Sequence, residues 1–561
     1  MRMRCVDSEV QGGEEVPRAC ARAVSPRARE VAAAIGCACA AALLLGGCMM
    51  IGPDYEPPPA PLAEDWIDGG PDGEASAAAA DEGSANRLWW TLFEDPVLDT
   101  LVERAYRDNP TVQVAGVRVL EALARRGVAI GGLFPQQQEA VAGYWRGTLS
   151  ENRADLRGLP TSYENWQLGL DAAWELDLWG RLRRGIEAAD ADVLAAVATY
   201  DDVLVTLIAE VATNYIALRT FEERLEVVKA NVEIQRRSFE IAHSKFEGGA
   251  VTQLDSAQAA SLLESTQSSI PDLLASIRQT ENNLCILLGM PPRDLRDLLG
   301  APKPIPRAPA EVAIGIPAEL LRQRPDVRRA ERLLAAQSAQ IGIAKADLLP
   351  RLSLIGTIAL TAQDFAQMFE GGSFEAFGGP TLSWAILNYG RINNNIRIQD
   401  ARFQQQIAVY ESTVLRAQGE AENAIASFLG AQRQVDFLGR SVEAATQAVE
   451  VADLQYREGA ADYTRVLNTQ QFLVDAQDRL LTAREAVALS LASLYKALGG
   501  GWEVRLVESF TSEETLHEMR ERTRWGSLSN GPHQHDEVEA AGEGTERERG
   551  WWRWRWWWPK W

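Results

Sequence analysis

The sequence has few of the side chains on which most metal and proton-transfer sites depend. Only four His occur among its 561 residues, and three of them lie in the last fifty. Five of its six Cys lie at or before residue 48, so the rest of the chain holds one thiol and cannot form an internal disulfide. We therefore expect no metal site in the body of the protein.

The sequence is also short of basic charge and of long apolar runs. It carries 56 Lys and Arg against 78 Asp and Glu, a net charge of −22, which argues against a nucleic-acid partner. Its one long apolar run lies near the start, which excludes a helical membrane protein with several spans. No Gly-rich phosphate loop followed by Lys and Ser or Thr is present, so the chain does not power transport itself.

The apolar run has the layout of an export signal. Residues 31–47 read VAAAIGCACAAALLLGG and follow Arg22, Arg27 and Arg29, so residues 1–47 are predicted to be a signal peptide. The first twenty residues are too long and too acidic for its basic region, which favours a translation start further downstream. The run ends in LGGC, which resembles the bacterial lipoprotein processing box and implies a lipid on Cys48. The alternative is a plain signal peptide with an incidental Cys.

Residues 48–86 are predicted to form the lipidated N-terminus and an extended tether. They are rich in Pro, Ala, Gly and acid, as in PDYEPPPAP, and such a composition cannot build a core.

The body of the chain contains one sequence unit that occurs twice. WELDLWGR at 174–181 matches WAILNYGR at 384–391 at an offset of 210, and the Leu-Gly pairs at 288–289 and 498–499 share that offset. We therefore predict repeats over residues 87–300 and 301–502. Each contains a helical stretch, two strands, a long helix and a return helix of about 35 residues after a Gly-containing break. The helical stretches are expected at 96–133 and 317–349, and the long helices at 181 to about 245 and 391 to about 456.

Residues 166–176 alternate between apolar and polar side chains, as a strand does. Trp166 and Trp174 lie on the apolar face, about 26 Å apart at ~3.3 Å per residue. That separation suits the apolar band and aromatic girdles of an outer-membrane barrel. We predict that both Trp face the membrane and that Asp171, Glu175 and Asp177 face a wet, acidic lumen.

Further strands are expected at about 138–148, 351–361 and 378–388. Four strands cannot close a barrel, because the smallest barrels have eight, so several chains must share one. A half-buried strand in a soluble sandwich fits residues 166–176 equally well, and an ordinary soluble coiled coil fits the helices. The export signal, and strand pairs inserted between helices in both repeats, decide against these alternatives.

Residues 48 to about 502 resemble the TolC-type outer-membrane efflux family, and specifically its NodT-like lipoprotein branch, which serves multidrug pumps of the RND class. The matching stretches are GPDY at 52–55, WELDLWGRLRR at 174–184, EVATNYIALR at 210–219, LLRQRPDVRRAERLLAAQ at 320–337 and IGIAKADLLPRLSL at 341–354.

This resemblance implies a membrane α+β fold. Three identical chains would form a twelve-stranded barrel in the outer membrane, continuous with an α-helical tunnel through the periplasm. Such proteins are not enzymes and need no cofactor; they are exit ducts for an inner-membrane pump, joined to it by a periplasmic adaptor. The alternatives are a duct for type I protein secretion, which shares the fold, and a periplasmic structural lipoprotein without a pore.

In this family the tunnel closes at the periplasmic helix tips, which motif alignment places at residues 249–255 and 459–468. Asp255 matches the acid of the first tip. Asp462 lies in the second tip, where Arg465 and Asn468 occupy positions that are often acidic in relatives. We therefore predict a contact between Asp255 and Arg465; the alternative is that both are merely solvated.

Residues 503–561 have no counterpart at the end of the first repeat and are predicted to be disordered. They end in WWRWRWWWPKW, an Arg/Trp alternation that can bind membrane interfaces. A poorly constrained or out-of-frame tail is the favoured reading, and nothing positions a metal at His533 or His535.

Overall fold

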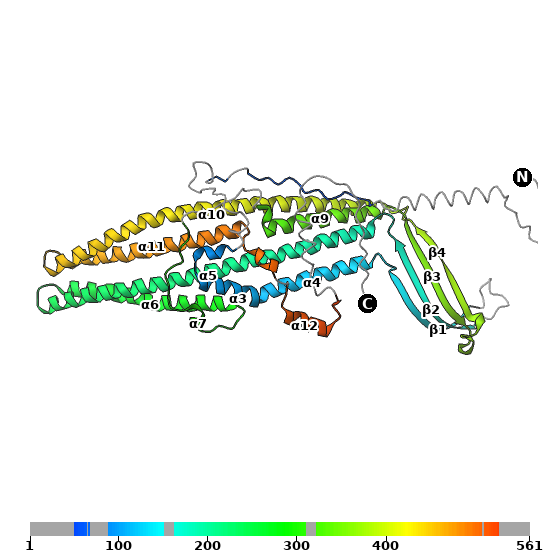
Figure 1. Cartoon of the computed structure of the whole chain (residues 1–561), viewed down its shortest axis with the longest axis horizontal. Helices are drawn as coiled ribbons and strands as arrows, with labels where there is room; N and C mark the ends of the chain where they lie inside the picture. The colour runs from blue at the N-terminus through cyan, green and yellow to red at the C-terminus, as the bar shows by residue number, and fades with distance from the viewer. Residues whose placement is uncertain are drawn as a thin grey trace, which may run out of the picture.

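The computed structural model describes residues 50–63, 66–67, 88–150, 162–309, 321–507 and 510–526. The predicted signal peptide, Cys48, most of the tether and residues 527–561 lie outside them. The described chain is elongated, with a four-stranded sheet at one end and the turns of two long helical hairpins at the other (Figure 1).

Both repeats contain a helix, two strands, a long helix and a return helix in the same order, and the first has the additional helix α3 before them. The first contains α3 (Pro96–Asp108), α4 (Pro110–Gly131), β1 (Gln137–Thr148), β2 (Ser162–Leu176), α5 (Arg181–Glu247) and α6 (Gln253–Leu287). The second contains α9 (Pro325–Ala346), β3 (Arg351–Ala362), β4 (Phe374–Ser383), α10 (Arg391–Arg457) and α11 (Tyr463–Ala497). The shorter elements are η1 (Trp89–Phe93), α7 (Arg296–Leu299), η3 (Phe365–Gln367), η4 (Gly371–Ser373), η5 (Trp502–Val507) and α12 (Glu513–Arg522).

The predicted long helices are confirmed to within two residues at their ends, and both return helices have 35 residues. No helix in the described part of the chain combines the length and apolarity needed to cross a membrane.

The helix expected over residues 96–133 is two helices, because Asn109 and Pro110 interrupt it. The Asn109 side chain accepts a hydrogen bond from the Thr111 backbone N–H at 2.7 Å and so caps the start of α4. Pro110 occupies the first helical position, where its missing N–H costs nothing. In the second repeat α9 begins at Pro325, and residues 317–320 of the predicted stretch lie outside the described residues.

In both repeats, the residue before the proline that starts a helix joins that helix to the end of the return helix. The Asn109 side-chain amide donates to the Leu287 carbonyl at the end of α6 at 2.8 Å. At the matching position in the second repeat, Arg324 donates to the Ala497 carbonyl at the end of α11. A helix start and a return-helix end are therefore joined twice, which is structural support for the duplication.

The main hydrophobic core lies where α3, α4 and α9 pack against the first half of α5. Trp89 is fully buried and its ring stacks on that of Tyr495 in α11, with centroids 5.7 Å apart. The start of the first repeat and the end of the second therefore share one core.

The four strands form one antiparallel sheet in the order β1-β2-β3-β4. β4 begins at Phe374 and ends at Ser383, so the expected strand at 378–388 was placed about four residues too late. Ser383 pairs with Arg351, the first residue of β3, and the chain beyond Ser383 therefore has no strand opposite it.

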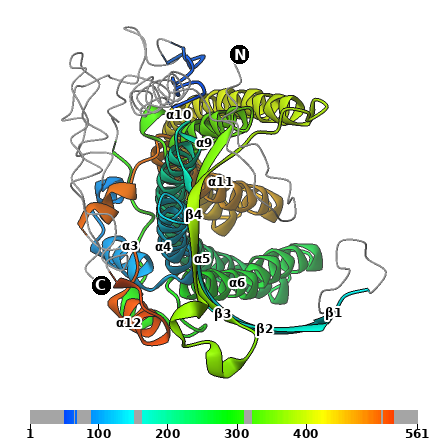
Figure 2. The same ribbon diagram turned by 90° about the vertical axis from the view of Figure 1, so that its right-hand side faces the viewer.

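The register separates the side chains into two faces. The even-numbered residues form the apolar face, which includes Ala140, Tyr144, Trp166, Leu170, Trp174, Leu354, Ile358, Leu360, Phe374 and Leu382. The odd-numbered residues form the mixed face, which includes Glu139, Trp145, Tyr163, Asp171, Glu175, Ser353, Thr357 and Glu375. Seen along the molecule's long axis, the sheet is an arc (Figure 2).

Residues 50–63 were expected to hang free as part of the tether, but they lie against the helices. The Ile51 N–H donates to the Trp179 carbonyl at 3.1 Å. Arg184, 2% exposed, donates to the Asp54 carboxylate at 2.8 Å and to the Ile51 and Gly52 carbonyls at 3.4 Å. Gly52 lies directly on the α9 backbone, since a Cβ there would be 2.5 Å from Gly342 Cα. We call residues 50–63 the N-terminal strap.

The prediction of disorder from residue 503 onward is wrong for residues 503–507, which belong to η5, and for residues 510–526. α12 forms there with Leu516 and Met519 buried, and the Ser512 side chain caps its start. The ring of Phe510 packs edge-on against Tyr200 of α5, and its carbonyl lies where a side chain at Gly116 would be. Burial of these apolar side chains is what orders the segment.

Candidate functional site: the helix tips and the strand–helix junction

The two helical hairpins reverse at their tips with the same backbone geometry. Gly249 and Gly459 have φ values of 70° and 76°, a region that suits glycine, and the N–H of the residue after each bonds back to the helix at 2.8 Å. The acceptors are the carbonyls of Lys245 and Gln455. The Gly breaks in the sequence therefore predicted the tips correctly.

The two tips of one chain are joined by Lys245, near the end of α5. Its ammonium donates to the carbonyls of Tyr456 and Arg457, which end α10, and lies 4.5 Å from the centroid of the Tyr456 ring. A cation is favoured there by the exposed carbonyls of a helix C-terminus and by the face of the ring. Sequence reasoning did not single out Lys245, because its partners lie about 211 residues away.

Tyr456 and Tyr463 form the centre of a small apolar cluster at the tips. Their rings meet edge-on with centroids 5.4 Å apart, and both side chains are almost fully buried. Burial raises the pKa of the Tyr456 hydroxyl, and the negative charge of Asp255 raises it further. Asp255, the acid predicted for the first tip, therefore acts on this tyrosine pair.

The other predicted tip residues have separate roles. Asp462 caps α11 by accepting from the Arg465 N–H at 3.2 Å, while the Arg465 guanidinium donates to the Gln455 side chain at 3.2 Å. Asn468 is exposed. The predicted Asp255–Arg465 contact does not form within the described chain, because Arg465 turns toward α10 instead.

Above the tips, α5 and α11 meet through polar side chains that the sequence analysis missed. Gln470 donates to Ser238 at 2.7 Å, and Asn231 donates to Gln477 at 2.8 Å. Further up, Arg224 contacts Asp478 at 3.3 Å. Positions 231, 235 and 238 follow 4-3 helical spacing, so polar residues at those seam positions were the signal that could have revealed this contact.

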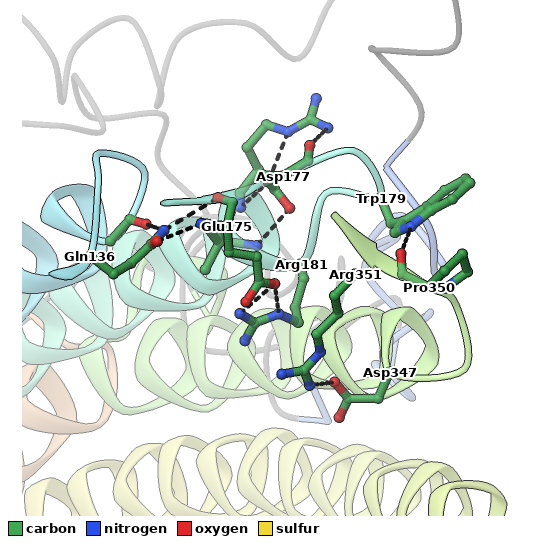
Figure 3. Close-up of polar contacts among 11 residues, drawn as sticks. Gln136, Glu175, Asp177, Trp179, Arg181, Asp347, Pro350 and Arg351 are labelled. Carbon is green, nitrogen blue, oxygen red and sulfur yellow. Dashed lines mark hydrogen bonds and ion pairs between the residues drawn. The ribbon is translucent and has the colours of Figure 1, made fainter. Parts of the chain in front are cut away.

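At the other end of the long helices, two of the acids predicted for the lumen, Glu175 and Asp177, lie at the strand–helix junction (Figure 3). Asp177 accepts from the backbone N–H groups of Leu182 and Arg183 at 3.0 and 2.9 Å, and from the Arg183 side chain. Glu175 accepts two hydrogen bonds from Arg181, at 3.1 and 2.8 Å.

Both carboxylates are therefore paired within the chain. Glu175 lies on the mixed face of β2, and the lining of a lumen by these acids stays a prediction. β2 ends at Leu176, so Asp177 lies beyond the strand alternation and caps α5 instead. Asp171 does lie on the mixed face, where it accepts from the Thr357 hydroxyl at 2.6 Å.

Other side chains brace the same junction (Figure 3). The Gln136 side chain donates to the Glu175 carbonyl and accepts from the Glu175 N–H at 2.7 Å. The Trp179 indole donates to the Pro350 carbonyl at 2.7 Å, which joins the first repeat to the second. Arg351 at the start of β3 pairs with Asp347 at the end of α9. These contacts therefore fix the orientation of the sheet relative to the helices.

The two predicted girdle tryptophans lie at opposite ends of β2, on the apolar face. Trp174 donates to the Leu133 carbonyl at 2.9 Å, and its counterpart Trp384 donates to Leu348 at the same distance. Trp166 packs on Tyr144, with ring centroids 4.4 Å apart, at the end distant from the helices. The structure does not test contact with lipid, and that remains a prediction.

A buried network on α5 was also missed. Tyr215 donates to Asp95, and Arg219, which is fully buried, donates to the Tyr215 hydroxyl at 3.0 Å and to the Leu299 carbonyl at 2.7 Å. Burial alone would raise the pKa of Asp95, but hydrogen bonds from Tyr215 and Lys303 overcome it and hold that pKa below its ordinary value. Tyr215 and Arg219 both lie in the EVATNYIALR stretch.

In the part of the chain that the structure describes, no three His, Cys, Asp or Glu side chains are grouped as a metal site would require. The geometry instead consists of long hairpins, a curved sheet and braced connections between them.

Comparison with known proteins agrees with this architecture. The model of the outer membrane efflux protein family matches residues 101–290 and 316–500, one match in each repeat. Nodulation protein T of Rhizobium leguminosarum bv. trifolii is 32% identical over 463 residues, which cover 82% of this chain and 96% of that protein. The toluene efflux pump outer membrane protein TtgI of Pseudomonas putida is 32% identical over 473 residues, 83% and 97% of the two chains.

Among solved structures, the outer-membrane channel OprN superposes with a TM-score of 0.73 at 34% identity, over 81% of this chain and all of that one. The family match spans well over half of the sequence and both repeats. The chain therefore belongs to the outer membrane efflux protein family.

Proposed function

We propose that this protein is the outer-membrane exit duct of a tripartite efflux pump and works as a homotrimer. The observation that carries the proposal is the four-stranded sheet, which has one apolar face and whose edge strands β1 and β4 pair with no further strand of the described chain. Because four strands cannot close, the edges need partners, and three copies supply twelve strands.

The helical hairpins supply the second part of the duct. α5 and α10 each have 67 residues, which at ~1.5 Å per residue is roughly 100 Å, long enough to reach far into the periplasm. Three chains would surround a tunnel with six such hairpins. We propose that their tips meet the periplasmic adaptor and an RND-type inner-membrane pump, which selects the cargo.

The cargo class follows from the relatives. TtgI is named for toluene efflux, and a 30% identical protein of Pseudomonas putida is named for pyoverdine export. These names favour small-molecule efflux over type I protein secretion for this chain. The duct would conduct passively, without an enzymatic step.

A lipid on Cys48 would fix the protein beside the barrel. The N-terminal strap begins at Met50, which packs on Gly180 where the long helix starts. Cys48 is two residues away, so its acyl chains would enter the membrane next to the strands. Labelling with radioactive palmitate tests this step: we expect label on the wild type and none on Cys48→Ser.

The proposed function is tested by single-channel recording on the purified full-length protein in planar bilayers, with its mass in detergent measured by light scattering. We expect a trimer and discrete conductance steps that grow when the tips are loosened by Lys245→Met. A protein that gives no step even with loosened tips would not be a duct, and a periplasmic lipoprotein without a pore would then be the better interpretation.

A further inference from the structure

β1 contains two glycines, Gly143 and Gly147, and each lies beneath an aromatic ring of the mixed face. A Cβ added at Gly143 would be 2.6 Å from the nearest ring carbon of Trp145. A Cβ added at Gly147 would be 2.7 Å from ring atoms of Tyr163. Side chains do not pack at such distances, so each ring can lie flat on the strand only because glycine is beneath it.

The two rings lie toward the end of the hairpin that is distant from the helices. Tyr163 is opposite Gly147 in the register, and Trp145 is opposite Asn165. The side chains of Trp145 and Tyr163 remain 49% and 45% exposed. Each ring therefore has one side against the backbone and the other side open.

The rest of the mixed face is different in character. Glu139 and Asp171 face one another nearer the helices, six residues along β1 from Trp145, or about 20 Å at ~3.3 Å per residue. In the β1–β2 hairpin the mixed face therefore changes from acidic near the helices to aromatic at the outer end.

We propose that Gly143 and Gly147 set the width of the outer mouth of the duct, because they let Trp145 and Tyr163 lie flat along its wall. The flat rings also offer planar apolar cargo a surface on which to stack. The inference rests on the proposed function, since the mixed face lines a bore only when the sheet is part of a closed barrel.

The physical consequence is directional. A side chain at either glycine would push the ring above it away from the strand backbone and toward the open side. The ring would therefore swing into the bore, and in a trimer three rings would do so together. Removal of the ring widens the bore, so it should cancel the narrowing that the added side chain causes.

The experiment measures the outer mouth separately from the tips. Polyethylene glycols of graded mass are added to the barrel side of bilayers that contain the full-length protein, because a polymer that enters the mouth lowers the current. For Gly147→Val we expect the largest polymer that blocks the wild type to lose its effect from the barrel side, and no change from the helical side. The double variant Gly147→Val with Tyr163→Ala should be blocked again by that polymer.

Gly379→Val is the matched control. Gly379 lies on the mixed face of β4, and no atom of the described residues lies within 4 Å of a Cβ added there, so the same side chain displaces no ring. We expect its polymer cut-off to equal that of the wild type. If Gly147→Val does not assemble, Gly143→Ala alone and with Trp145→Ala repeats the comparison at the other ring.

The outcomes separate the two hypotheses. Three results would each overturn the inference and leave the proposed function intact. They are normal current with an unchanged polymer cut-off in the glycine variants, an equal fall of the cut-off in Gly379→Val, and no recovery of the cut-off when the ring is removed. A wild-type protein that gives no current would refute the proposed function, and the inference with it.

Discussion

α5 and α10 are copies of one helix that have acquired different surroundings. Both have 67 residues, yet 27 residues of α5 are buried against 13 of α10. α5 packs against α4, α6, α9 and α11, whereas α10 packs chiefly against α9 and α11. The duplication therefore kept the backbone and changed the neighbours, which leaves α10 with an outward face that the proposed trimer can cover.

The same difference appears where strands meet helices. The first repeat has Glu175 and Asp177, paired with arginines at the start of α5, while the matching positions of the second repeat hold Ala385 and Leu387. Leu387 is 80% exposed. The first junction has ion pairs at these positions, and the second presents an exposed apolar side chain there.

The largest effect is expected from the buried cation of the first repeat. Arg219→Met removes the donor to Tyr215 and Leu299 and should cost about 3 kcal/mol of stability, because buried partners are left unpaired. The matching residue at an offset of 210 is Leu429, and Leu429→Met should cost less than ~1.5 kcal/mol. Thermal unfolding followed by circular dichroism compares the two, and equal losses would contradict the asymmetry.

A smaller effect is expected at the junctions. Asp177→Ala should cost about 1–2 kcal/mol, because the backbone N–H groups of Leu182 and Arg183 lose their acceptor. Leu387→Ala in the second repeat should change the stability of an isolated chain much less. Unfolding of detergent-dissociated monomers is the measurement, and a greater loss for Leu387→Ala would reverse the assignment.

At the tips, Lys245→Met removes the ammonium that hydrogen-bonds α5 to the end of α10. We expect a loss of about 0.5–1 kcal/mol, from the helix end that it caps, and a higher resting conductance in bilayers. Lys229→Met is the control, since Lys229 is half exposed and pairs with Glu226 on its own helix. A rise in conductance with both variants would remove the special role of Lys245.

The smallest effect concerns pH. Burial raises the pKa of Asp202 above its ordinary value of 3.8, and Asp326 raises it further. The folded state therefore holds this proton more tightly than the unfolded state, so charging the group costs stability as pH rises above 3.8 toward the raised value. Asp202→Asn should raise the melting temperature by roughly 1–2 °C at pH 7 and by less at pH 4. A larger gain at pH 4 would contradict the direction.

The sequence predicted what depends on local pattern. The Gly breaks located both tips, and the alternation at residues 166–176 located β2, because period and turn chemistry act over short separations. The end of β4 was misplaced because it depends on where β3 begins, a tertiary fact. Lys245, Arg219 and the partner of Arg465 could not be found, since each contact joins positions that only packing brings together. The order of residues 510–526 was missed because it depends on the close approach that Gly116 permits.

The N-terminal strap has a mechanical consequence. A lipid on Cys48 would be connected to Met50 by a two-residue linker, at most about 7 Å long. After this linker, the strap is hydrogen-bonded at Ile51 and Asp54 by Arg184, which lies in the first turn of α5, close to the strands. A pull on the anchor would therefore be borne at the base of the sheet, and the rest of the strap would carry almost no load. Anchor and barrel would drift through the membrane as one rigid body.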